Sequence, residues 1–142
     1  MREILFKGKR KDNGEWVEGF YFCMVHDDGS HIHHFIMPLG VDLSFGTPIE
    51  KIQVEIDIKT LCQYTGLTDK NGNKIWENDV VKCNYNYYGD KGTYIGKVIF
   101  REDTCLFLVT DMKSTNYEWW NEEKEVIGNI FDNPELLKEG AE

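Results

Sequence analysis

The sequence has few prolines, no closely spaced pair of cysteines and no long apolar run. Structural zinc sites take their cysteines in tight pairs, so the scattered cysteines argue against a zinc ribbon. We expect them to be reduced and to act as small hydrophobic side chains. No stretch reaches the roughly 18 apolar residues of a membrane span, and no apolar leader opens the chain. These absences predict a cytoplasmic protein with no membrane partner. The cysteines are Cys23, Cys62, Cys83 and Cys105.

Basic residues are also scarce. The chain has 16 lysines and arginines against 25 aspartates and glutamates, which gives a formal net charge of −9. A surface of this sign repels phosphate backbones unless its basic residues cluster. The charge balance therefore argues against nucleic-acid binding.

The sequence lacks the common catalytic motifs. It contains no G-x-S-x-G elbow, no G-x-x-x-x-G-K loop and no G-x-G-x-x-G turn. Its carboxylates are numerous but have no regular spacing, as on a solvated surface. We expect no catalytic residue, no cofactor and no enzymatic activity.

What the chain does contain is apolar alternation with a period of two. Residues 2–37 alternate around two turns, at 12–14 and 27–30, which predicts a β-meander. Residues 38–50 read as a linker with two prolines, followed by a strand near 52–56. Asp57 has the side chain of a helix N-cap and Gly66 suits a helix end, so we expect a short helix at about 58–65.

The second half predicts a small barrel of short strands separated by glycine-containing turns. Val81, Cys83, Tyr85 and Tyr87 fall on one face of its first strand. Asn133 followed by Pro134 predicts a last helix at about 134–139. The expected fold is mainly β, with α+β character only at its margins. It divides into a meander subdomain at 1–57 and a barrel subdomain at 58–142.

The histidines follow the pattern H-x4-H-x-H-H. On a strand, His31 and His33 would share a face, and His26 could join them across a turn. Two imidazoles on one face can chelate a transition metal, but no cysteine or carboxylate motif completes the set. Histidines also fill half-buried strand positions without any metal. We therefore predict no metal site and name His26, His31 and His33 as the candidates if one exists.

Three stretches carry a family resemblance. They are the centre (63–67, 69–72 and 75–81), the start (6–10 and 13–19) and the end (128–131 and 133–137). Together they resemble the YopX family of phage and prophage proteins. The match runs through the whole length in order, more loosely at about 27–50 and 101–125. Asn78 stands where many relatives carry glycine, and asparagine also tolerates a positive φ, so we expect the turn to form.

The resemblance implies a β-rich fold with an SH3-like barrel in the second half, and an origin in mobile elements. It implies no established activity, catalytic residue or cofactor. In SH3-like folds, aromatic side chains on the loop side form grooves for extended peptides. The aromatic residues of the second half are open to two interpretations: core packing, or in part an interface. The residues we expect in an interface are Tyr88, Asp90, Glu118 and Trp120.

Two functional hypotheses follow. The first is a non-enzymatic interaction module in a bacterial host, which binds a host or phage protein or itself. The second is a protein that handles a small molecule or nucleic acid, with its site in a cleft between the two halves. The sequence favours the first hypothesis, because it contains none of the common catalytic motifs.

Overall fold

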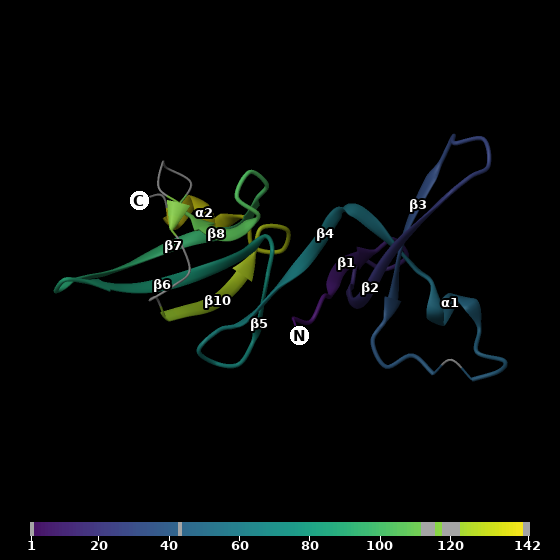
Figure 1. The fold of residues 1–142 in the computed structure, drawn as a ribbon, viewed down its shortest axis with the longest axis horizontal. Helices are drawn as coiled ribbons and strands as arrows, with labels where there is room; N and C mark the ends of the chain where they lie inside the picture. Colours follow the sequence, from purple (N-terminus) through teal and green to yellow (C-terminus); the bar gives the residue numbers. More distant parts are fainter. Residues whose placement is uncertain (1, 43, 112–115, 118–122, 141–142) are drawn as a thin grey trace. The chain divides into compact units, whose positions relative to one another are not determined.

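The computed structural model of the 142-residue chain describes every residue except 1, 43, 112–115, 118–122 and 141–142. The described chain forms two five-stranded antiparallel sheets and only short helices (Figure 1). The predicted mainly-β fold is therefore confirmed. Contacts divide the chain into unit 1 (1–64) and unit 2 (65–142), whereas the expected boundary was 57/58. No helix of the described residues is long and apolar enough to cross a membrane.

Unit 1 is a closed ring of strands. β1 (Phe6–Arg10) pairs with β2 (Trp16–Val25), and β2 pairs with β3 (Ile32–Pro38). β4 (Val54–Thr68) pairs with β3 at its start and with β1 further along, which closes the ring. The apolar side chains of this unit that are almost fully buried are Leu5, Ile36, Val54, Ile56, Cys62 and Tyr64.

Gly19 is the residue at which β2 changes partners. It lies opposite Phe6 of β1 and also opposite Pro38 of β3, so β2 pairs with β1 before this point and with β3 after it. A Cβ atom at this position would collide with the carbonyl oxygen of Met37. Only glycine lets the two backbones approach so closely at the corner of a small ring.

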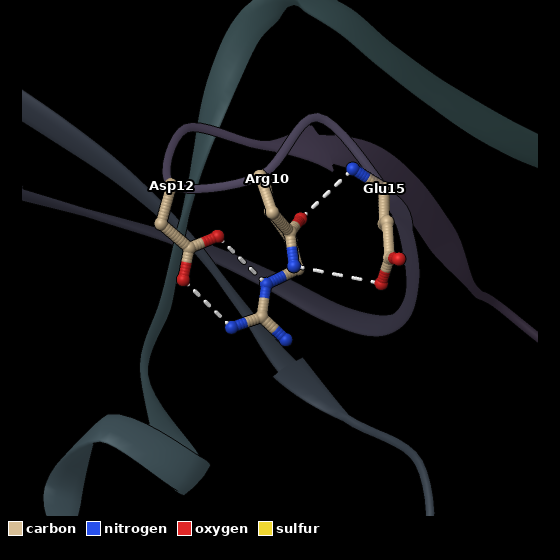
Figure 2. A network of polar contacts seen from close by, with 4 residues as sticks. Arg10, Asp12 and Glu15 are labelled. Carbon is tan, nitrogen blue, oxygen red and sulfur yellow. Dashed lines mark hydrogen bonds and ion pairs between the residues drawn. The ribbon is translucent and has the colours of Figure 1, made fainter.

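The turn between β1 and β2 forms as its asparagine and glycine predict. Gly14 has a φ of +74°, and the Arg10 amide donates to the Glu15 carbonyl at 2.9 Å. Figure 2 shows the Arg10 guanidinium bound to both carboxylate oxygens of Asp12, at 2.9 and 2.8 Å. The hydrogen bonds from Arg10 lower the pKa of the Asp12 carboxyl. The pair is solvent-exposed, so it orders the turn without adding much stability.

The predicted helix at about 58–65 is wrong, because these residues belong to β4. The carboxylate of Asp57 does accept the Lys59 amide, at 3.1 Å, as an N-cap would. The chain then bulges instead of coiling. The Thr60 hydroxyl donates to the Asp57 carbonyl at 2.6 Å and accepts the Lys9 amide of β1 at 2.8 Å.

The pairing with β1 shows the size of this bulge. Lys7 lies opposite Cys62, whereas Lys9 lies opposite Asp57. Gly66 has the left-handed backbone expected of it, with a φ of +88°, but it lies inside β4 and ends no helix. Pairing with a neighbouring strand has overridden the local capping signals.

Unit 2 contains β5 (Lys74–Trp76), β6 (Asp79–Tyr87), β7 (Asp90–Arg101), β8 (Leu106–Thr110), β9 (Asn116–Tyr117) and β10 (Glu123–Asn129). β5 continues the first sheet, next to β4. The other five strands form the second sheet, in the order β10-β6-β7-β8-β9. Among the described residues no pairing joins β10 to β9, so the SH3-like barrel stays a prediction. Its buried cluster is Ile75, Val81, Cys83, Val98 and Val109, with Tyr94, Phe107 and Val126 packed against it.

The two helices are short. α2 (Glu135–Gly140) lies where the sequence predicts a last helix. The Asn133 side chain, however, accepts the Asn129 amide at 3.2 Å, so it ties the helix to the end of β10. α1 (Ile49–Ile52) follows Pro48 and replaces part of the expected linker and strand.

Candidate functional site

The turn at residues 69–73 is built around the side chain of Asp69. One carboxylate oxygen accepts the backbone amides of Asn71 and Asn73, both at 2.9 Å. The other accepts the backbone amide of Val126 in β10, at 3.0 Å. Asp69 is 7% exposed. A carboxylate with these donors is fully engaged in holding the turn against β10.

Burial and hydrogen bonding act in opposite directions on Asp69. Burial tends to raise the pKa of its carboxyl. The amides of Val126, Asn73 and Asn71 favour the ionised form more strongly, so the pKa is lowered from its ordinary value. The next amide, that of Lys70, donates to the Lys124 carbonyl at 3.1 Å. The turn therefore covers part of the outer edge of β10, which limits pairing with other chains.

A second turn precedes β6. Asn78 has a φ of +70°, as its place in the sequence predicts. Its amide donates to the Val98 carbonyl at 2.9 Å, and its carbonyl accepts the Ile130 amide at 3.0 Å. Asp79, 2% exposed, accepts the Trp76 amide at 2.8 Å. The hydrogen bonds of these polar residues connect strands of unit 2. We therefore infer that the central stretch, 63–81, has a structural role.

The exposed candidate surface lies on the hairpin of β6 and β7. Among the described strands, β10 starts opposite Asn84 and β8 pairs with β7 only from Lys97 onward. Residues 85–95, which we call the hairpin arm, lie beyond the end of β8, and their outer part, 85–92, also lies beyond the start of β10 (Figure 1). Tyr88 and Gly89 form the tip, with φ values of +50° and +86°.

The structure places two of the four predicted interface residues together. Tyr88, at the tip of the arm, is 93% exposed, and the exposed Asp90 lies two residues further on. Glu118 and Trp120 lie outside the described residues. Sequence reasoning missed the hollow beside the arm, of about 510 Å³, because the hollow needs residues from distant segments. Its lining is Asn84, Tyr85, Asn86, Lys91, Gly92, Thr93 and Glu123.

The arm has its own packing. Tyr85 lies opposite Gly92, and a Cβ on Gly92 would collide with the tyrosine ring. Tyr85 also contacts Tyr94, with ring centroids 6.3 Å apart. An aromatic ring that covers a cross-strand glycine stiffens a two-stranded ribbon. Tyr85 lies on the face of β6 that the sequence predicts to point inward, but it is only half-buried. Its ring stabilises the arm.

The three candidate histidines gather at the end of the β2–β3 hairpin. The ring of His26 lies 5.5 Å from that of His31 and 5.1 Å from that of His33, between centroids. Sequence reasoning missed Glu55, whose carboxylate is 2.9 Å from Nδ1 of His33. Glu55 lies opposite Phe35, which is two residues after His33 on the same face of β3. A diagonal contact between Glu55 and His33 could therefore have been expected once the pairing of these two strands was known. In the described part of the chain, no group of three or more His, Cys, Asp or Glu side chains could hold a metal ion.

Comparison with known proteins gives a family and a fold. The family model described as YopX protein matches residues 5–138. The crystal structure of protein EF1440 from Enterococcus faecalis is similar, with a TM-score of 0.54 and 23% sequence identity. That similarity covers 96% of this chain and 99% of the other, and at this identity it concerns the fold alone. No curated protein matches the chain.

Proposed function

Starting from the fact that this chain belongs to the YopX family, we propose that it is a non-enzymatic interaction module of phage or prophage origin. It works in the cytoplasm of a bacterial host. Its partner is a host or phage protein, or a second copy of the chain. The hairpin arm, with Tyr88 at its tip and Asp90 beside it, makes the contact.

The observation that carries this proposal is the exposed ring of Tyr88. A tyrosine with a positive φ is strained, and glycine or asparagine would form the same turn at lower cost. The ring is 93% exposed, so burial within the chain does not offset that strain. Backbone strain at an exposed aromatic is typical of a functional position, and tyrosine is among the residues that dominate binding energies.

The rest of the arm supports a protein partner. The hollow beside it is lined mainly by amide, hydroxyl and oppositely charged side chains, with the Tyr85 ring among them. Polar groups around an aromatic anchor are typical of the rim of a protein interface. The side-chain NH₂ group of Asn84 donates to the Glu123 carboxylate at 3.3 Å, which links the base of the arm to β10.

The variant Tyr88→Asn tests the proposal, because asparagine keeps the positive φ while it removes the ring. We expect it to fold normally and to bind the partner about 30-fold more weakly, as for an interface hot spot of about 2 kcal/mol. The partner is first identified by quantitative mass spectrometry of proteins captured from the bacterial host by the full chain. Affinities are then measured with the purified partner, or by sedimentation if the chain binds itself.

The matched control is Phe45→Ala, which removes a fully exposed aromatic ring from unit 1. It should bind like the wild type. Equal affinity of Tyr88→Asn and the wild type would contradict the proposed surface. A metabolite or nucleic acid retained by the purified chain in native mass spectrometry, with no protein partner, would favour the small-molecule or nucleic-acid alternative.

A further inference from the structure

Two imidazoles meet across the β2–β3 hairpin of unit 1. His26 follows the last residue of β2, and His33 is the second residue of β3. Their Nε2 atoms are 3.1 Å apart. His26 is exposed and the His33 side chain is 42% exposed, so solutes can reach both nitrogens.

Glu55 determines which nitrogen of His33 carries the proton. Its carboxylate is 2.9 Å from Nδ1 of His33 and 3.5 Å from the Lys11 ammonium. The Glu55 side chain is 34% exposed, and a glutamate in contact with water is a carboxylate at neutral pH. A carboxylate can only accept, so Nδ1 of His33 is the donor and Nε2 keeps its lone pair. A carboxylate behind a histidine in this way is the usual support of a metal-binding imidazole.

A similar relay orients His31, the third imidazole of the group. The Ser30 hydroxyl donates its one proton to the Asp28 carboxylate at 2.6 Å. It therefore accepts from Nδ1 of His31, which lies 2.8 Å away. The His31 ring lies beside that of His26, with the ring centroids 5.5 Å apart.

The separation of the two nitrogens suits a shared metal ion. Ligand nitrogens at about 2.0–2.1 Å from a metal lie about 2.9 Å apart at a right angle and about 3.3 Å apart in a tetrahedron. The observed 3.1 Å lies between these values. If Nδ1 of His33 carries the proton of that ring, the hydrogen bond between the two Nε2 atoms takes its proton from His26. A metal ion can replace it once His26 carries its proton on Nδ1.

The geometry points to a binding site for a late divalent transition-metal ion, Zn²⁺, Ni²⁺ or Cu²⁺, held by Nε2 of His26 and His33. Water completes the coordination, since no third side chain of the described residues converges on the pair. Imidazole nitrogen suits these metals, and hard cations such as Mg²⁺ prefer oxygen. The site lies on unit 1 and the hairpin arm on unit 2, so either proposal can fail without the other.

Calorimetric titration of the tag-free full chain with NiCl₂ and with ZnCl₂ tests the site. We expect one ion per chain and micromolar affinity, with no heat from MgCl₂. The variants His26→Gln and His33→Gln should each abolish binding. Glu55→Gln should weaken it by about 10-fold or more, because the imidazole loses its orienting partner.

His34→Gln is the matched control. His34 is adjacent in the sequence, points to the opposite face of β3 and lies 2.7 Å from the Tyr21 hydroxyl. It should bind metal like the wild type. Circular dichroism shows whether each variant is folded, and broadening of histidine NMR signals by Ni²⁺ identifies the ligands directly. Absence of heat and of selective broadening at millimolar nickel, or an equal loss in His34→Gln, would overturn the site.

Discussion

Replacing Asp69 with alanine is expected to lower the free energy of unfolding of unit 2 by about 3–5 kcal/mol. The substitution removes the acceptor for the backbone amides of Asn71, Asn73 and Val126 at once. A hydrogen bond to a charged acceptor contributes about 1.5–3 kcal/mol, and water replaces part of the loss at Asn71 and Asn73, which are exposed. Chemical denaturation gives the total loss. Hydrogen exchange should show that it is concentrated in the turn and β10.

Asp69→Asn is the control, and it separates charge from shape. Its amide oxygen can still accept within the turn, but its NH₂ group cannot accept the Val126 amide. We expect about half the loss seen with alanine. A variant with alanine that unfolds like the wild type would show that Asp69 does not hold the turn.

The lowered pKa of Asp69 also predicts a pH dependence. Its ionised form is favoured in the folded chain, so its contribution to stability is complete above the unfolded value of about 3.9. That contribution is lost as the pH falls through the lower folded value. The stability of Asp69→Asn should therefore fall less steeply below about pH 4 than that of the wild type.

The second large effect is expected from Gly19→Ala. Its new methyl group would meet the Met37 carbonyl oxygen, which belongs to the backbone of β3 and cannot rotate away. Overpacking commonly costs about 1–3 kcal/mol, and we expect about 3 kcal/mol or more here because two strands must separate. Denaturation of the full chain, with hydrogen exchange in β2 and β3, measures the loss.

Gly14→Ala is the matched control for Gly19→Ala. Gly14 has open space around the added Cβ, so only its positive φ is penalised, at about 1 kcal/mol. Equal stability of the two variants would mean that the close approach of β2 and β3 at Gly19 is not needed.

The sequence predicts much of this fold, because alternation and turn residues are local signals. The Asn-Gly turn at 13–14, the positive φ of Asn78 and the inward positions of Val81 and Cys83 are all confirmed. The predicted helix at about 58–65 failed for a non-local reason. Asp57 does accept the amide two residues on, but pairing with β1 turns the segment into a bulged strand. A single sequence does not reveal that partner.

The candidate sites show the same limit. The exposure of Tyr88 follows from its place in a tight turn, and the clustering of His26, His31 and His33 follows from a hairpin visible in the sequence. Glu55 joins the histidines only through strand pairing, and Val126 reaches Asp69 across 57 residues. Contacts between residues so far apart in the chain cannot be read from a single sequence, whereas the exposed turns can.

We propose that the turn around Asp69 stabilises unit 2, whereas the tip of the hairpin arm binds the partner. The most direct test is the affinity of Asp69→Asn and of Tyr88→Asn for the purified partner, at a temperature where both are folded. We expect near wild-type affinity for Asp69→Asn and a loss of about 30-fold for Tyr88→Asn. The reverse result, with binding lost in Asp69→Asn and kept in Tyr88→Asn, would contradict it.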